Sequence, residues 1–193
     1  MIPSEKIKEE VLKCVEVLKS GGTILYPTDT IWGIGCDATN EEAVKKVFAI
    51  KKRSASKSLI VLLDAPEKLN KYVREVPAAA WDLIEYSEKP LTIVYSDAMH
   101  LAKNITGADG TIAIRIVKND FCIALLRKFG KPLVSTSANI SGEDAPLSFN
   151  HINQNILSQM GYVVNLPHEI NRTGKPSTII KIESNGVIKF LRK

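Results

Sequence analysis

The sequence is poor in the side chains that most often build metal centres and catalytic triads. Its three cysteines, Cys14, Cys36 and Cys122, lie far apart and form no C-x-x-C pair, so neither a disulfide framework nor a zinc site is expected. The three histidines are equally scattered. A metal site with His and Cys ligands, or a triad that uses a histidine base, is therefore not predicted.

Long apolar runs and the common nucleotide-binding motifs are also missing. No apolar run approaches the roughly 18 residues of a membrane span, and the opening stretch MIPSEKIKEE lacks the apolar core of a signal peptide. We therefore expect a cytoplasmic protein with no membrane partner. There is no GxxxxGK(S/T) motif, which excludes a P-loop. Gly33-x-Gly35-x-x-Ala38 matches a dinucleotide fingerprint superficially, but the strand before it ends too early and the helix after it begins too late.

What is present is ordinary for a globular domain with a surplus of positive charge. Hydrophobic residues make up 45% of the 193 residues and charged residues 24%, and a chain of this length is expected to form one domain over 1–193. Lys and Arg together number 26 against 21 Asp and Glu, a net charge of +5. This positive charge suits an anionic partner, which could be RNA or a nucleotide, but it is equally compatible with a protein that has no specific anionic partner.

Predicted helices and strands alternate along most of the chain. Helices are predicted over 5–19, 43–52, 66–73, 77–86, 121–130 and 148–160, and strands over 23–28, 58–63, 91–95, 111–117, 132–137 and 162–166. Thr39 and Glu42 have the spacing of a capping box before the second helix. Two β-rich runs around Asn185-Gly186 predict a closing hairpin. We predict an α/β fold with a twisted, mixed parallel and antiparallel sheet and surrounding helices.

A cluster of positively charged side chains lies between the second predicted helix and the strand that follows it. Lys51, Arg53 and Lys57 lie there among serines, and no acidic residue occurs between Glu42 and Asp64. Several cations with nearby hydroxyls can share the charge of a polyphosphate. The alternative is a helix C-terminus with favourable positive charge and a solvated loop.

Arg115 occupies the middle of the predicted strand TIAIRIV. Because side chains alternate along a strand, Ile112 and Ile114 point to one face and Arg115 to the other. A desolvated guanidinium requires an anion. That anion is either a substrate carboxylate or phosphate, or an Asp or Glu of the same chain.

Small hydroxyl and amide side chains lie at the ends of two other predicted strands. PLVSTSANISG places Ser135, Ser137 and Asn139 at alternate positions, and GKPSTII places Ser177 at the start of a strand. In open α/β sheets, ligands favour crevices at strand ends. If the sheet brings these residues near Arg115, they form a polar cleft.

Taken together, these stretches resemble the YrdC-type threonylcarbamoyl-AMP synthase family, in its short, single-domain form. YPTDTIWGIGCDA is similar to the family's PTDTxYGLGCDA, KKRSASKSLIVLL to KGRxxxKPLxVL, LTIV to PLTLV, TIAIRIV to TVAVRVP, PLVSTSANISG to PLVxxSANxSG, and PSTII to PSTIV. The matches run in family order from about Thr23 to Arg192. Lys52 stands where the family has Gly, Ser58 where it has Pro, and Trp32 where it has Tyr.

The resemblance implies a sheet with a basic concave groove and the joining of L-threonine, bicarbonate or CO2, and ATP into threonylcarbamoyl-AMP, with Mg2+ held through the ATP phosphates. The product would serve the t6A modification of tRNA through a downstream transferase machinery. The residues implied to bind threonine are Thr30, Arg115, Ser135 and Ser177. Those implied to bind ATP are Arg53, Lys57, Thr111, Ser137, Asn139, Ala145 and Arg192. Those implied to act in catalysis are Lys51, Arg53, Lys57 and Asn139.

Two alternatives to an enzyme are carried forward. The first is a non-catalytic module that binds tRNA or double-stranded RNA through the basic groove, although aromatic residues, at 6%, offer few stacking platforms. The second is an interaction subunit of a larger modification complex, which would carry an exposed apolar patch.

Overall fold

The computed structural model describes residues 4–53, 59–166, 173–183 and 186–193. Its strands are β1 (Ile24–Tyr26), β2 (Gly33–Gly35), β3 (Ile60–Leu63), β4 (Leu91–Tyr95), β5 (Ile112–Ile116), β6 (Leu133–Ser137), β7 (Tyr162–Val163), β8 (Thr178–Ile182) and β9 (Ile188–Arg192). Its α-helices are α1 (Glu5–Lys19), α2 (Glu41–Ile50), α3 (Leu69–Tyr72), α4 (Ala78–Tyr86), α5 (Asp120–Phe129) and α6 (Gln154–Leu157). Three short 3-10 helices cover Pro66–Lys68, Lys103–Ile105 and Phe149–His151.

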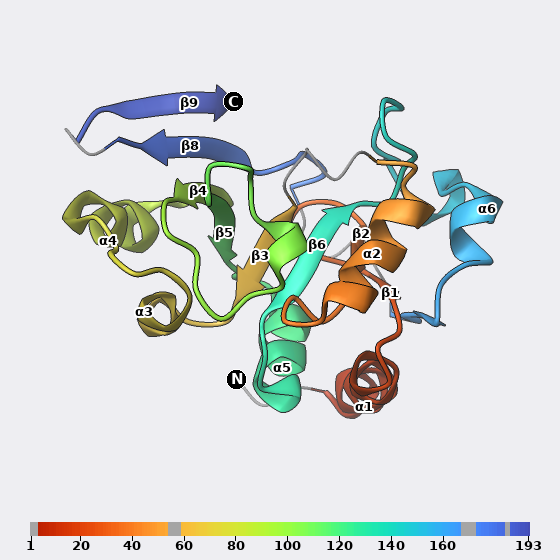
Figure 1. Ribbon diagram of the computed structural model, residues 1–193. Helices are drawn as coiled ribbons and strands as arrows, with labels where there is room; N and C mark the ends of the chain where they lie inside the picture. The colour runs from red at the N-terminus through yellow and green to blue at the C-terminus, as the bar shows by residue number, and fades with distance from the viewer. Residues whose placement is uncertain (1–3, 54–58, 167–172, 184–185) are drawn as a thin grey trace.

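The strands form one mixed sheet in the order β7-β1-β2-β6-β3-β5-β4-β8-β9. β3 runs parallel to β5 and β4 parallel to β8, whereas β4 is antiparallel to β5 and β8 is antiparallel to β9. The β8–β9 hairpin forms one edge of the sheet and lies at the top of Figure 1, far from α1 at the bottom. The predicted mixed α/β fold is therefore confirmed.

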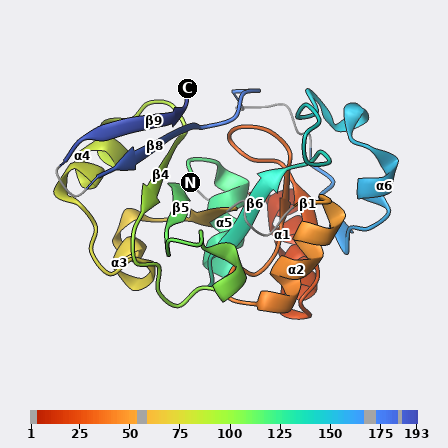
Figure 2. The same ribbon diagram turned by 45° about the horizontal axis from the view of Figure 1, so that its top comes forward.

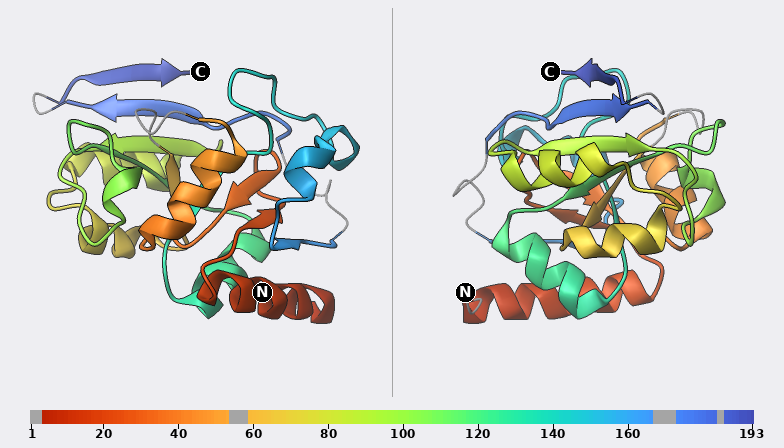
Figure 3. Two further views of the ribbon diagram at one scale, coloured as in Figure 1. Left: turned by 45° about the vertical axis from the view of Figure 1, so that its right-hand side comes forward. Right: turned by 90° about the vertical axis from the view of Figure 1, so that its left-hand side faces the viewer.

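Helices cover the two faces of this sheet unequally. One face packs Val61, Ile93 and Ile114 against buried residues of α2, α3 and α4. The other face packs Leu62 and Leu133 against α1 and α5, which lie together on the side of the sheet away from the hairpin (Figure 3). Figure 2 shows α4 beside the hairpin at one end of the molecule and α6 beside α2 at the other. Among the described helices, none packs on the part of the second face toward β4 and β8.

Most predicted elements are present, and the differences lie at the cap of α2 and in the segment 148–160. The Ser4 hydroxyl caps α1, as its position before the helix implies. The cap of α2 is Asn40, whose Oδ1 accepts from the amides of Glu42 and Ala43, so the predicted capping box was wrong. Thr39 instead donates its hydroxyl to Asp37 at 2.6 Å. The helix predicted over 148–160 is reduced to a 3-10 turn and the short α6. The hairpin is confirmed, although Asn185 lies outside the described residues.

Strand β2 is an element that the sequence pattern did not predict. It pairs antiparallel with both β1 and β6, and its two glycines allow this close approach. A Cβ added to Gly35 would lie 2.6 Å from the Tyr26 ring and 2.7 Å from the carbonyl oxygen of Val134. The Gly-x-Gly pair thus serves packing within the sheet, which agrees with the exclusion of a dinucleotide loop.

Candidate functional site

A cavity of about 290 Å³ lies over the part of the second sheet face that α1 and α5 leave open. Its floor is a row of residues that lie opposite one another on four neighbouring strands. Ile60 of β3 pairs with Ser135 of β6 on one side and with Ala113 of β5 on the other, and Ala113 pairs in turn with Val94 of β4. Side chains two positions away share this face, which places Arg115 there as the alternation predicted. Cavity-lining residues that the sequence had singled out are Thr30, Arg53, Arg115, Ser135, Ser137, Ala145, Ser177 and Arg192.

Arg115 is held in the cavity wall by the loop that follows β1. It is 3% exposed, its Nη2 lies 3.2 Å from Oδ1 of Asp29, and its Nη1 donates to Oγ1 of Thr30 at 3.1 Å. The Thr28 hydroxyl lies 2.8 Å from that of Thr30 and supports it from behind. The internal ion pair that the sequence left open therefore exists, and Arg115 lines the cavity as well. Asp29 thus compensates the buried charge of Arg115, while part of the guanidinium faces the cavity.

Asp29 is the counter-ion of Arg115, a partner that the sequence did not reveal. Within the described ranges neither of its carboxyl oxygens accepts a hydrogen bond, and its contact with Arg115 is an ion pair alone. It does not line the cavity, so its influence passes through Arg115. The signal was the requirement of Arg115 for an anion, but sequence separation gave no means of choosing Asp29 among the carboxylates.

The cation cluster separates into two roles at the end of α2. Arg53 lines the cavity, and burial lowers its pKa. Lys51 is 1% exposed and does not line the cavity; its Nζ donates to the carbonyl oxygens of Ser137 at 2.5 Å and Asn139 at 2.7 Å. Burial, and then the nearby charge of Arg53, lower the pKa of Lys51 to about 8. Lys51 thus joins the end of α2 to the end of β6.

Ser177 and Arg192 close the cavity from the hairpin. Ser177 directly precedes β8, and its carbonyl oxygen and hydroxyl accept from Nε and Nη2 of Arg192 at 3.0 and 3.2 Å. Burial, followed by the charge of Arg115, lowers the pKa of Arg192. The two guanidinium groups therefore act on one small space, which favours anionic ligands.

Other predicted residues lie outside the cavity lining. The Thr111 hydroxyl donates to Asp109 at 2.7 Å. Asn139 lies just after β6, where its Nδ2 donates to the carbonyl oxygens of Ile140 and Glu143. Lys57 lies outside the described residues. For Lys51, Thr111 and Asn139 the predicted contacts with ligand stay predictions.

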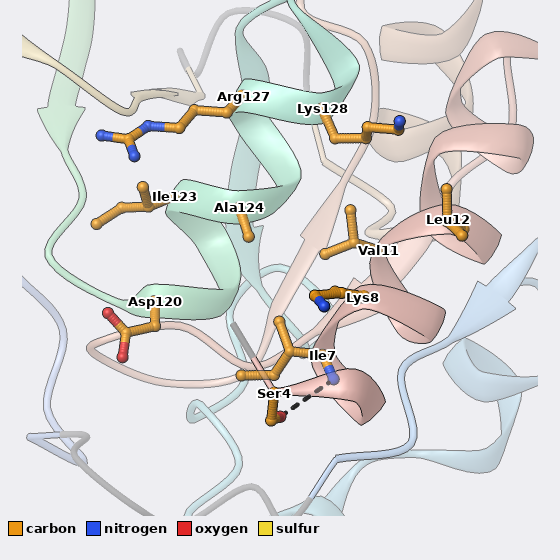
Figure 4. A pocket seen from close by; sticks show the side chains of 10 residues that line it. All are labelled: Ser4, Ile7, Lys8, Val11, Leu12, Asp120, Ile123, Ala124, Arg127 and Lys128. Atoms are coloured by element: carbon orange, nitrogen blue, oxygen red, sulfur yellow. Dashed lines mark hydrogen bonds between the residues drawn. The ribbon is translucent and has the colours of Figure 1, made fainter. Parts of the chain in front are cut away.

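The described residues contain a second, larger hollow that shares none of these side chains. It has a volume of about 980 Å³ and lies between α1 and α5, where Ile7, Val11 and Ala124 form its apolar surface (Figure 4). No group of three or more His, Cys, Asp or Glu side chains that could hold a metal occurs in the described part of the chain. No helix in the described ranges is long and apolar enough to cross a membrane. The smaller cavity is the candidate site because the predicted residues converge there.

Comparison with known proteins identifies relatives over nearly the whole chain. Residues 16–193 match the family model Sua5_yciO_yrdC, which is described as "Telomere recombination". The chain is 36% identical over 181 residues to the threonylcarbamoyl-AMP synthase of Pseudoalteromonas translucida (strain TAC 125), an alignment that covers 92% of this chain and 95% of that protein.

Solved structures of related proteins have the same fold. P. abyssi Sua5 in complex with L-threonine has a TM-score of 0.87 and 27% identity, with 96% of this chain and 54% of that chain covered. The chain thus spans about half the length of that relative. E. coli YciO has a TM-score of 0.81 at 20% identity, with 96% and 89% covered, and supports the fold alone.

Proposed function

The chain belongs to the Sua5/YciO/YrdC family, and we propose that it is a threonylcarbamoyl-AMP synthase that joins L-threonine, bicarbonate or CO2, and ATP with release of pyrophosphate. The observation that carries the proposal is the convergence of three arginines, Arg53, Arg115 and Arg192, with the hydroxyls of Ser135 and Ser177 in one cavity. A substrate carboxylate and a triphosphate are both anions, and arginine binds either in bidentate fashion.

The amino-acid end of the reaction is assigned to Arg115 and its neighbours. The carboxylate of threonine binds the guanidinium face of Arg115 that Asp29 and Thr30 leave open, and Ser135 and Ser177 enclose the amino acid. The neutral amine nitrogen then attacks the carbon of CO2, a carbon–nitrogen bond forms, and one carbon–oxygen π bond opens to leave the carbamate oxygen negatively charged. The proton lost by the nitrogen passes to solvent. The cavity holds the amine and CO2 together, so that their encounter becomes effectively intramolecular.

The nucleotide end is assigned to Arg53, Ser137 and Arg192. A carbamate oxygen attacks the α-phosphorus of ATP, a new phosphorus–oxygen bond forms, and the bond to the pyrophosphate oxygen breaks. Positioning and neutralisation of charge are the main contributions that a protein makes to such a transfer. The cavity accordingly contains arginines and hydroxyls, with no histidine among its lining residues in the described ranges.

Mg2+ is proposed to enter as the complex with ATP. The described residues offer no cluster of carboxylates for a resident metal, and Mg2+ commonly binds through substrate phosphates with few protein ligands. The further proposed partners are bicarbonate or CO2, a t6A machinery that takes the product, and tRNA that contacts the protein directly. The net charge of +5 supports contact with RNA.

Product formation tests the proposal directly. The purified protein is incubated with ATP, Mg2+, threonine and bicarbonate, pyrophosphate release is followed, and threonylcarbamoyl-AMP is sought by mass spectrometry. We expect pyrophosphate release to require both threonine and bicarbonate. Equal release without threonine contradicts a synthase, and binding of RNA without any adenylate product favours the non-catalytic alternative.

The role of Arg115 is tested with a matched pair of substitutions. Arg115→Ala should lower kcat/KM for threonine about 10²-fold or more, because one preorganised charged contact is lost. Arg127→Ala is the control, since Arg127 is 69% exposed and pairs with Asp64 outside the cavity. Arg115→Lys keeps the charge and serves if the alanine variant does not fold. Threonine affinity equal to wild type in both Arg115 variants contradicts the assignment.

A further inference from the structure

Thr92 is a buried residue of β4 that the proposed reaction leaves without a role. Its side chain has no solvent exposure, and its Oγ1 lies 2.7 Å from Oγ of Ser177. In the described part of the chain, Ser177 is the one hydrogen-bond partner of this hydroxyl. Thr92 is also absent from the cavity lining. Any effect of Thr92 on a ligand must therefore pass through Ser177.

Strand register explains why the two hydroxyls meet. Thr92 pairs with Ile179 of the parallel strand β8, and Ser177 lies two positions before Ile179, so its side chain points to the same sheet face. On the other side, Thr92 pairs with Arg115 of β5. Thr92 consequently stands between Arg115 and Ser177, which are both assigned to the amino acid.

Ser177 is in turn the anchor of Arg192. The register of the hairpin shifts between Ile179 and Ile180, which pair with Arg192 and Phe190, so that Leu191 is the extra residue of a bulge. Bulges near active sites re-aim side chains, and here Leu191 and Arg192 both line the cavity. The guanidinium of Arg192 then donates twice to Ser177. Ser177 therefore touches the amino-acid region and holds an arginine assigned to the nucleotide.

The donors and acceptors of the two hydroxyls can be counted. A serine hydroxyl donates one hydrogen and accepts up to two, and a guanidinium only donates, so Arg192 occupies one acceptor position of Ser177. If Ser177 donated to Thr92, it would have no hydrogen left for a ligand. A carboxylate only accepts, so its arrival requires Thr92 to donate to Ser177 and Ser177 to donate to the carboxylate.

We propose that Thr92 is a positioning residue for the synthase reaction: its hydroxyl directs that of Ser177 toward the threonine carboxylate and, through Ser177, fixes Arg192 for the nucleotide. This inference rests on the proposed function. A chain of hydrogen bonds that begins at a charged donor is mutually strengthening. Because one serine serves both substrates, binding of ATP and binding of threonine are coupled through it, and each increases affinity for the other.

The test compares three threonine variants. Thr92→Val keeps the shape and removes the hydroxyl, Thr92→Ser keeps the hydroxyl, and Thr23→Val removes a different buried threonine hydroxyl away from the cavity. For Thr92→Val we expect the KM for threonine to rise about tenfold, roughly the worth of one hydrogen bond, with a smaller rise for ATP and a lesser change in kcat. Thr92→Ser and Thr23→Val should keep wild-type KM values.

Calorimetric titration with threonine, in the presence and absence of a non-hydrolysable ATP analogue, separates this inference from the proposed function. In the wild type the analogue should tighten threonine binding, and Thr92→Val should remove most of that effect. Unchanged threonine affinity and coupling in Thr92→Val would overturn the inference, as would a Thr92→Ser variant as impaired as Thr92→Val. A wild-type protein that binds both ligands but makes no adenylate contradicts the synthase proposal instead.

Discussion

Arg115 combines a buried ion pair with a place in the cavity wall, where the proposed reaction assigns it the threonine carboxylate. Asp29 and Thr30 contact two of its nitrogens. The loop that carries these two residues is hydrogen-bonded to the segment before β8, because the amide of Thr173 donates to the carbonyl oxygen of Asp29 and the amide of Gly174 to that of Thr30. The ion pair compensates the charge before any substrate binds. The guanidinium is therefore oriented in advance, and such preorganisation lowers the cost of binding a carboxylate.

Removal of the Asp29 charge should destabilise the protein. Asp29→Asn leaves Arg115 buried without a counter-ion, and loss of one partner of a buried pair costs about 3 kcal/mol or more. Urea denaturation measures the free energy of unfolding. Asp64→Asn is the control, since its partners Lys68 and Arg127 are 44% and 69% exposed and remain solvated. A loss below about 1 kcal/mol in Asp29→Asn would show that the pair does not matter for stability.

Lys51 should make stability depend on pH in the alkaline range. Its pKa is lowered to about 8 in the folded protein from 10.5 in the unfolded chain. Between these values the unfolded chain binds a proton that the folded protein has released, so the contribution of Lys51 to the free energy of unfolding increases as pH rises from about 8 to 10.5. Conversely, this contribution of Lys51 to the free energy of unfolding is lost as the pH falls from 10.5 through about 8.

The comparison for Lys51 uses Lys51→Met, which has a chain of similar length and no titrating group. We expect the free energy of unfolding of the wild type to rise relative to this variant between pH 8 and pH 10. Urea denaturation at each pH gives the two curves. Parallel curves over this interval would contradict the lowered pKa.

Among the elements, the end of α2 places Arg53 in the cavity wall and Lys51 beside the end of β6. The amide of Arg53 donates to Phe48 and that of Lys52 to Ala49, which is the pattern of a Schellman motif. Such a motif needs a left-handed residue, and Lys52 adopts φ 47° there. This is the position where the motif of the related family has glycine, so the fold keeps the geometry while the sequence departs from it.

Two opposite substitutions test these helix ends. Lys52→Gly should stabilise the protein by about 0.5–1 kcal/mol, because glycine adopts a positive φ without steric cost. Gly130→Ala at the end of α5, where φ is 77°, should destabilise it by about 1 kcal/mol for the same reason. Thermal or urea unfolding gives both values. A destabilised Lys52→Gly variant would show that the Lys52 side chain stabilises the protein by more than its left-handed backbone conformation costs.

At the scale of the whole molecule, one sheet carries two cores. Cys36 belongs to the core under α2, and Cys14 and Cys122 belong to the core under α1 and α5. All three thiols are free and buried. Burial raises their pKa, that of Cys14 to about 12. Because the reactive species is the thiolate, the thiols should be inert in the folded protein.

Cysteine labelling therefore reports whether both cores unfold together. We expect iodoacetamide to modify none of the three cysteines in the native protein and all three over one common range of urea concentration, as a single cooperative domain requires. Peptide mass spectrometry gives the extent of labelling at each site. Labelling of Cys14 and Cys122 at a lower urea concentration than Cys36 would show that the two faces unfold separately.

Features that depend on neighbours in the chain were determined by the sequence itself. The alternation in TIAIRIV placed Arg115 opposite the isoleucines, and the β-rich runs around Asn185-Gly186 predicted the hairpin. The order of the short motifs also indicated the family. These features could be predicted because helix and strand periodicity and cap preference act over a few residues.

Features that depend on distant partners were decided only by the tertiary structure. It paired Arg115 with Asp29, made Gly33–Gly35 a strand between β1 and β6, and turned Lys51 from the cavity toward two carbonyl groups. It also joined Thr92 to Ser177, a contact across 85 residues of sequence. The position of Thr92 between Arg115 and Ser177 follows from the register of β5, β4 and β8, and the contacts of Lys51 follow from the packing of the end of α2 beside the end of β6. No local pattern encodes how such distant segments meet.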